Sequence, residues 1–231
     1  MEIDLFLWPM LLPMLIPIFY CLKYKKQSSK IIGLISFVVI LIVILYWPLL
    51  NLNFLGEYTY ICTKFFLFVI LPLIFLQLIE SKKTQINFIH YGIKKQKLKE
   101  STKFFIFFIP IMILATITIQ LINGATTEYN IFQATLMFFE AFNEEFFFRG
   151  ILFVYLTNKT NLHVAYLTSL LSFILIHPQN LSSIFIAGTI IQGVLTIEIC
   201  RKTDNIFGAW LLHGTNRFFT IAIFPLLMLM F

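Results

Sequence analysis

The sequence has little charge. Only 12% of its 231 residues are Asp, Glu, Lys or Arg, whereas 59% are hydrophobic. A soluble domain has about 25% charged and about 45–50% apolar residues, so this composition excludes a soluble protein and indicates an integral membrane protein. Apolar stretches take up nearly all of the chain, and we expect no separate soluble domain within it.

Cysteine is also scarce, and other common signals are missing. Cys21, Cys62 and Cys200 are scattered without a CxxC spacing, which excludes a disulfide framework and a cysteine-based zinc site. The first residues lack the positive segment and the small-residue cleavage site of a signal peptide. We therefore expect the first apolar helix to be retained, and we find no internal repeat.

Eight apolar stretches are long enough to cross a bilayer, which takes about 20 helical residues. The sequence therefore predicts an all-α, polytopic membrane bundle of about eight transmembrane helices. We divide it into an N-terminal unit of four spans, residues 1–130, and a core of four spans, residues 131–231. The expected spans are residues 3–22, 31–50, 61–79, 104–122, 131–156, a sixth from the turn at 158–161 to His177, 183–199, and 206 to the C-terminus with a bend near Pro225.

Positive charge is concentrated in alternate loops. By the positive-inside rule, the basic loops are expected in the cytoplasm, and eight spans then put both termini outside it. This distribution, rather than nucleic-acid binding, accounts for the net charge of +6. The basic loops are 23–30 with four lysines, 80–103 with seven, Lys159, and Arg201 with Lys202; loops 51–60, 123–130 and 178–182 have no Lys or Arg.

One expected span contains several charges. Residues 131–156 include Glu140, Glu144, Glu145 and Arg149. A charged side chain near the bilayer centre costs at least a few kcal/mol, so four in one span indicate a functional site. On a helix, Glu145 and Arg149 are i,i+4 neighbours that can pair, as are Glu140 and Glu144. Glu144 lies about 100° round from Glu145 and is the carboxylate least committed to Arg149, which makes it the candidate for chemistry.

Two histidines lie in other expected spans. His177 ends the sixth span, and His213 lies in the eighth, where Asn216 and Arg217 share its helix face by i+3 and i+4 spacing. An ionisable residue inside the membrane is a functional-site hypothesis by default. With Glu144, these residues provide a carboxylate, two imidazoles and an amide. Such a set can activate a water and stabilise an oxyanion.

Three motifs in this region resemble those of the CAAX protease and bacteriocin-processing family (CPBP, or Abi). They occur in order as Glu-Glu-x-x-x-Arg at residues 144–149, Phe-x-x-x-His at 173–177, and a His/Asn motif at 213–216. The resemblance covers about residues 131–220. It implies an all-helical intramembrane endopeptidase of a bacterial cell membrane.

The resemblance also implies roles for the residues that match. Glu144 and His177 would position and activate the attacking water, and His213 and Asn216 would stabilise the tetrahedral oxyanion. Glu145 and Arg149 would hold the helix in place.

One position departs from the family pattern. The third motif commonly has Asn four residues after His, but here Asn216 is at +3 and Arg217 is at +4. Arg217 is expected to pair with a carboxylate such as Glu140, or with an anionic group such as a lipid phosphate. A second function therefore stays open: acyl transfer from phospholipid to the amino terminus of a bacterial lipoprotein, a reaction in which one branch of the family takes part. A third possible function is that of a non-catalytic membrane scaffold.

The sequence has no HExxH motif. Two histidines and a glutamate could bind zinc, but they would come from three separate helices, and the family's glutamate–histidine mechanism needs no metal. We therefore expect no cofactor, with zinc as the alternative. The expected partners are membrane lipids, a membrane-anchored peptide or lipoprotein substrate and a further membrane protein, but no nucleic acid. The basic amphipathic segment 93–99 could lie on anionic headgroups or be a solvated loop.

Overall fold

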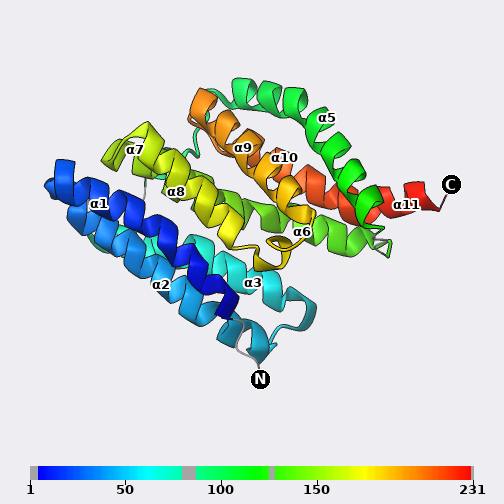
Figure 1. The fold of residues 1–231 in the computed structure, drawn as a ribbon, viewed down its shortest axis with the longest axis horizontal. Coiled ribbons are helices and arrows are strands. Elements are labelled where there is room, and N and C mark those ends of the chain that lie inside the picture. The colour runs from blue at the N-terminus through cyan, green and yellow to red at the C-terminus, as the bar shows by residue number, and fades with distance from the viewer. Residues whose placement is uncertain (1–4, 80–86, 125–127, 230–231) are drawn as a thin grey trace.

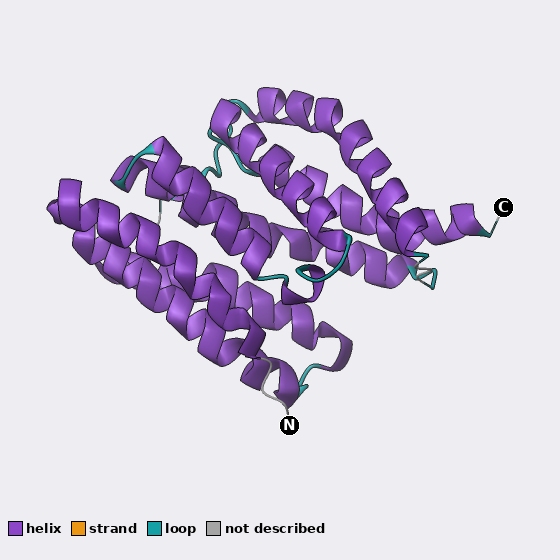
Figure 2. Cartoon of the chain, in the orientation of Figure 1, coloured by secondary structure: helices purple, strands orange, loops and turns teal. Residues whose placement is uncertain are grey.

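The computed structural model describes residues 5–79, 87–124 and 128–229. These residues form helices and loops and no strand, which confirms the all-α class (Figure 1, Figure 2). The α-helices are α1 (Leu15–Tyr24), α2 (Ser29–Leu52), α3 (Thr59–Phe65), α4 (Leu71–Ile79), α5 (Leu98–Asn123), α6 (Ile131–Glu145), α7 (Leu156–Lys159), α8 (Leu162–Leu175), α9 (Phe185–Thr203), α10 (Phe207–Phe218) and α11 (Phe224–Met228). The 3₁₀ elements are η1 (Leu5–Met14), η2 (Lys26–Ser28), η3 (Gly56–Tyr58), η5 (Phe88–Tyr91) and η7 (Pro178–Asn180), and the π-helical ones are η4 (Phe66–Ile70), η6 (Phe146–Tyr155) and η8 (Phe219–Ile223).

Each of the eight expected spans falls mainly on helical structure where the chain is described, with turns or bends at some span ends. Residues 3–4 of the first span, 80–86 of the long basic loop, 125–127, and 230–231 of the eighth span lie outside the described residues. Among the described residues, five helical stretches are long and apolar enough by themselves to cross a membrane, so a multi-pass membrane protein is confirmed. They are Leu7–Tyr24, Lys26–Leu52, Gly56–Gln77, Leu98–Asn123 and Phe207–Met228.

The other three expected spans lie on α6 with η6, on α8 and on α9, and length and composition alone do not mark them as spans. The α6–η6 segment carries Glu and Arg, α9 ends in charged residues, and the apolar α8 is short. Their polar residues are tolerated because these helices pack mainly against protein. In Figure 1, α1, α2 and α3 form one side of the bundle and α5, α9 and α10 the other, while α6 contacts α3 and α10, and η6 contacts α8 and α9.

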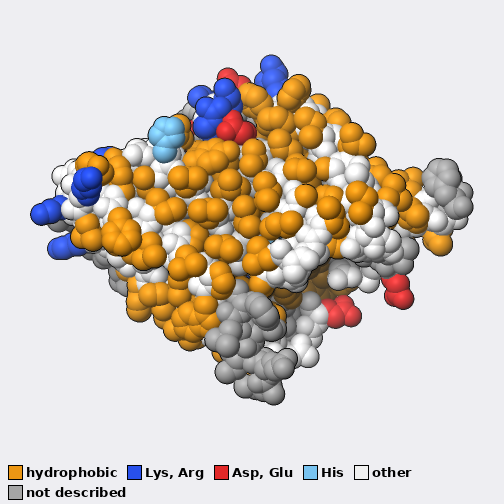
Figure 3. Space-filling model, viewed as in Figure 1, with side chains coloured by type: hydrophobic (Ala, Val, Ile, Leu, Met, Phe, Trp, Pro, Cys, Tyr) orange, Lys and Arg blue, Asp and Glu red, His pale blue; other side chains and the backbone are white. Residues whose placement is uncertain are grey.

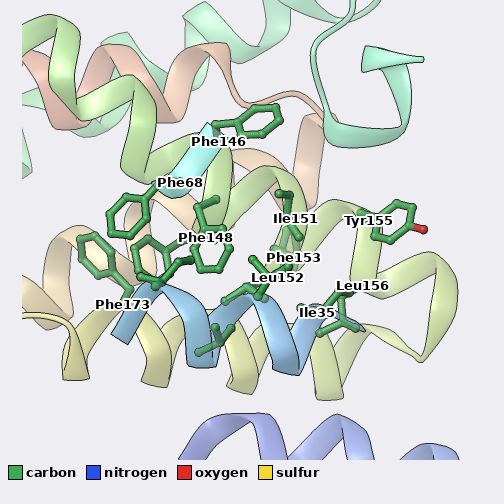
Figure 4. Close-up of a cluster of buried hydrophobic side chains, with 14 of the residues drawn as sticks. Ile35, Phe68, Phe146, Phe148, Ile151, Leu152, Phe153, Tyr155, Leu156 and Phe173 are labelled. Carbon is green, nitrogen blue, oxygen red and sulfur yellow. The ribbon is translucent and has the colours of Figure 1, made fainter. Parts of the chain in front are cut away.

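The centre of the bundle is η6, and all ten of its residues are buried. Phe148 packs against Phe68 from η4 and Phe173 from α8, with ring centroids 5.9 and 5.5 Å apart (Figure 4). Gly150 is needed here, because a Cβ at this position would lie 2.9 Å from the carbonyl oxygen of Tyr91. This aromatic core holds the helix that carries the candidate site.

The predicted cytoplasmic loops meet one another in the structure. Lys25 donates a hydrogen bond to the carbonyl oxygen of Thr160 at 2.6 Å, and Lys94 forms an ion pair with Asp204. In Figure 3, basic side chains gather along the left and upper edges, and hydrophobic side chains cover much of the face between them and the lower right. The structure thus groups the basic loops, while the membrane side that they face stays a prediction.

Candidate active site

The site is built on the last turn of α6, where the backbone passes into the π-helical η6. π-helical turns are rare in proteins, and those that occur are often found at functional sites. Glu140, Glu144 and Glu145 lie just before it and are each at most 1% exposed. Buried charges are tolerated only when they are paired or hydrogen-bonded, so the partners of these three carboxylates define the site.

Glu145 pairs with Arg149 as its i,i+4 spacing predicts, with Arg149 Nε 3.2 Å from Glu145 Oε2. The guanidinium also donates to Thr196 on α9 at 2.8 Å and to Ser169 on α8 at 3.3 Å. Its central carbon lies 4.4 Å from the ring centroid of Phe173. Arg149 thus links η6 to two further helices, as expected for a residue that holds the helix in place.

The two carboxylate oxygens of Glu144 differ in their hydrogen-bond partners. Oε1 accepts from Lys64 and, at 2.8 Å, from Arg217. Oε2 has no hydrogen-bond partner among the described residues and lies 3.7 Å from Nε2 of His177 and 3.8 Å from Nε2 of His213. These distances exceed a direct hydrogen bond and suit a bridging water.

His177 follows the last residues of α8 and precedes Pro178, and the residue before a proline is disfavoured in the α-helical region. It has left that region, with φ −110° and ψ 63°. Its Nδ1 lies 2.8 Å from the carbonyl oxygen of Phe173. A carbonyl oxygen can only accept, so Nδ1 carries a proton, and in the neutral ring Nε2 presents a lone pair toward Glu144.

His213 and Arg217 lie one turn apart on α10. Arg217 Nε donates to His213 Nε2 at 2.9 Å, so His213 Nδ1 carries the proton that it donates to Glu145 Oε1 at 2.8 Å. The guanidinium of Arg217 also pairs with Glu140 through NH1. Of the two partners expected for Arg217, the structure therefore contains the protein carboxylate.

Asn216 lies beside this network and contacts other residues. Its Oδ1 accepts from Thr116 on α5 at 2.7 Å, and its Nδ2 donates to Gln192 on α9 at 3.1 Å. All eight residues predicted for the site thus lie in one region, although Asn216 contacts neither Glu144 nor His213 through a hydrogen bond. Their catalytic or supporting roles stay predictions.

Three further residues of the site, Lys64, Thr116 and Gln192, were not predicted from the sequence. Lys64 is 3% exposed, with Nζ 3.0 Å from Oε1 of Glu140 and also paired with Glu144. One signal was available, because Lys64 is the single charged residue of the expected span 61–79 and a charge inside a membrane span is costly. Thr116 and Gln192 are neutral, and no comparable signal marks them.

Two cavities meet at this site. The larger, of about 630 Å³, is lined by Tyr46, Trp47, Leu50 and Ile176 and reaches Lys64, Glu144 and His177. The smaller, of about 210 Å³, shares His177 with the larger. Its lining combines apolar side chains with amide and hydroxyl side chains and with the site residues of α10: Met112, Ile119, Phe173 and Phe185, then Thr116, Gln120, Asn180, Thr189 and Gln192, then His213, Asn216 and Arg217.

The residues present do not suit a metal ion. In the described parts of the chain, no three His, Cys, Asp or Glu side chains cluster so that they could hold one. Glu144, the carboxylate nearest both histidines, is occupied by the cations Lys64 and Arg217, and these would repel a divalent cation.

A family model described as type II CAAX prenyl endopeptidase Rce1-like matches residues 102–219, just over half of the chain. The match contains every predicted site residue and α5 from residue 102 onward, but it excludes Lys64. No curated protein and no solved structure is significantly similar to the chain.

Proposed function

Because the chain belongs to the Rce1-like family of type II CAAX prenyl endopeptidases, we propose that it hydrolyses a peptide bond of a membrane-anchored or lipidated substrate. The proposed reactive group is a water held between Glu144 and His177. The family assignment supports an intramembrane endopeptidase in general, and the site geometry supports these particular residues.

One observation carries the proposal. Glu144 Oε2 is buried, has no hydrogen-bond partner among the described residues, and lies between two imidazole nitrogens at 3.7 and 3.8 Å. A buried carboxylate oxygen without a partner is costly. An ion pair that only holds two helices together does not require a free carboxylate oxygen. A general base does require one, because the free oxygen binds the proton that the base accepts.

In the proposed reaction, the water oxygen attacks the carbonyl carbon of the scissile peptide. The proton that it loses goes to the Glu144–His177 pair, where Glu144 Oε2 and His177 Nε2 are the acceptors. The same proton then passes to the amide nitrogen as the C–N bond breaks, which yields a carboxylic acid and an amine. The acid keeps the second proton of the water and loses it to the released amine or to solvent.

The oxyanion that forms during attack needs hydrogen-bond donors. The small cavity provides a place for it, because His213, Asn216 and Arg217 all line this cavity. Asn216 Nδ2 gives one N–H to Gln192 and has a second one to donate. We assign Asn216 and Arg217 as the direct donors, and His213 as the group that holds Arg217 Nε.

The larger cavity suits the apolar part of a substrate. Leu50 and Ile176 provide aliphatic surface and Tyr46 and Trp47 aromatic surface, next to Glu144. Such a lining fits a hydrocarbon chain. The smaller cavity shares His177, and its amide and hydroxyl groups can hydrogen-bond to the peptide backbone of the substrate.

The test is hydrolysis of a defined peptide by the purified protein in lipid nanodiscs. The probe is a peptide that ends in a CAAX sequence with a farnesylated cysteine, and the product is the released tripeptide, detected by mass spectrometry. Glu144→Gln should lower the rate by at least about 100-fold at normal membrane level, because the amide keeps the shape and loses the basic oxygen. Glu57→Gln, an exposed change, is the control.

Cleavage that persists in Glu144→Gln would refute the assignment of the base. If the wild type cleaves neither this peptide nor any lipoprotein of the host membrane, the peptidase proposal fails. The same incubation tests acyl transfer, which would consume phospholipid and extend a lipoprotein amino terminus by one acyl chain in a Glu144-dependent way.

A further inference from the structure

The helix α3 brings a charge into the site from outside the matched family region. Lys64 lies near the end of α3 and is buried, and no other charged residue lies in residues 61–79. Its Nζ is 4.5 Å from the ring centroid of Tyr60, which adds a cation–π contact. A lysine whose ammonium group is removed from water in this way needs a compensating function or partner.

The buried charges of the site balance only when Lys64 is counted. The carboxylates are Glu140, Glu144 and Glu145. Arg149 engages Glu145, while Arg217 is shared between Glu140 and Glu144. Three carboxylates therefore require a third cation, and Lys64 provides it by contacting Glu140 and Glu144 together.

The contacts of Lys64 also determine how the Glu144 carboxylate is turned. The terminal torsion of a glutamate has broad preferences, so neighbouring groups decide where its oxygens point. Lys64 and Arg217 both bind Oε1. This leaves Oε2 turned toward His177 and His213, where the proposed water is activated.

We propose that Lys64 is a positioning residue that acts through Glu144, an inference that rests on the proposed function of Glu144 as a base. Arg217 alone does not replace it, because the guanidinium is also engaged by Glu140 and His213. The catalytic site of this protein is therefore completed by an N-terminal helix that the family match does not include.

The test separates positioning from charge balance. Lys64→Met removes the ammonium group and leaves one uncompensated carboxylate, whereas Lys64→Met combined with Glu140→Gln restores neutrality. We expect the double variant to reach the membrane level of Glu140→Gln alone but to have a kcat lower by roughly 100-fold, with KM changed by less than about threefold. Lys64→Arg should recover part of the kcat, and Lys103→Met, an exposed lysine change, should have no effect.

A second readout needs no substrate. Dicyclohexylcarbodiimide is an apolar reagent that modifies buried carboxyl groups when they are neutral, and ion-paired Glu144 should resist it. We expect a mass-spectrometric adduct on Glu140 or Glu144 in Lys64→Met, where the two carboxylates share the single cation Arg217, and no adduct in the wild type or in the charge-balanced double variant. Equal labelling of the wild type and Lys64→Met would overturn the charge-balancing contact of Lys64, and a double variant with the kcat of Glu140→Gln alone would overturn its positioning role. If no peptide is cleaved by the wild type, the labelling result still decides whether Lys64 compensates these carboxylates.

Discussion

His213 and Glu145 stand 68 positions apart in the chain and meet through Nδ1 and Oε1 at 2.8 Å. Glu145 thus binds two groups, because its other oxygen faces Arg149. A carboxylate that accepts from Nδ1–H holds an imidazole in one tautomer and orientation. The residue expected only to hold its helix therefore also orients a histidine of the site.

Glu145→Ala should lower both protein level and activity. The change removes the carboxylate partner of the buried Arg149 and the acceptor of His213, and breaking a buried pair costs about 3–5 kcal/mol. Membrane abundance and thermal unfolding measure the loss, and Arg149→Ala should match it. The control is Glu198→Ala, which breaks a half-buried i,i+3 pair with Arg201 and should cost about 0–1 kcal/mol. Equal stability of Glu145→Ala and Glu198→Ala would contradict this prediction.

His177→Gln should lower activity without lowering protein level. Among the described residues, the ring makes one direct hydrogen bond, to the carbonyl oxygen of Phe173, so little stability depends on it. Loss of a general base costs about 100- to 10,000-fold in rate. Hydrolysis of the farnesylated peptide and membrane abundance are measured in parallel. A silent His177→Gln would favour the non-catalytic scaffold, in which phenotype follows abundance.

Arg217→Leu should reduce protein level, because it leaves the buried Glu140 and Glu144 with one cation between them. Adding Glu140→Gln should restore the level by removing the uncompensated charge. Failure of this rescue would indicate that Arg217 stabilises the fold in another way, for example through His213.

Arg217→Lys tests the geometry of the same group. A lysine has one nitrogen and cannot make the separate contacts that Nε, NH1 and NH2 make to His213, Glu140 and Glu144. We expect normal level and a rate lower by about tenfold or more. The contacts of Arg217 within the protein already predict this loss of rate, so the variant does not distinguish a peptidase from an acyltransferase. Measuring whether phospholipid is consumed does distinguish them. Full activity of Arg217→Lys would mean that the guanidinium contacts are dispensable.

Thr116→Val should lower kcat less than Asn216→Ala does. Thr116 Oγ1 donates to Asn216 Oδ1 at 2.7 Å, so its loss frees the amide to turn, whereas Asn216→Ala removes the proposed oxyanion donor and costs about 100-fold or more. Thr118→Val is the matched control, since this exposed threonine of α5 donates to the carbonyl oxygen of Leu114 in its own helix. If Thr116→Val and Thr118→Val behave alike, Asn216 does not depend on Thr116.

Chelators should leave hydrolysis of the farnesylated peptide unchanged. Lys64 and Arg217 occupy Glu144 Oε1 and would repel a divalent ion at the carboxylate nearest both histidines. The measurement is the rate after incubation with EDTA or 1,10-phenanthroline, followed by dialysis. A loss of activity that zinc restores would show that a metal is used.

The sequence by itself determined the membrane class, the helical segments and the contacts within one helix. Hydropathy and length decide whether a segment can span a bilayer, and a helix of 3.6 residues per turn brings i,i+4 neighbours together. For this reason the Glu145–Arg149 contact was predictable, and the i+4 spacing placed His213 and Arg217 on one face. The cost of charge in a span also pointed to Glu144 before any partner was known.

Only the tertiary structure decided which helices meet. An apolar helix in a bundle has many faces that pack equally well by composition, so its rotation and neighbours depend on side-chain fit over the whole bundle. That packing brings Lys64 to Glu144 across 80 positions and Thr116 to Asn216 across 100. The orientation of the Glu144 carboxylate follows from these contacts between helices, which no spacing within one helix encodes.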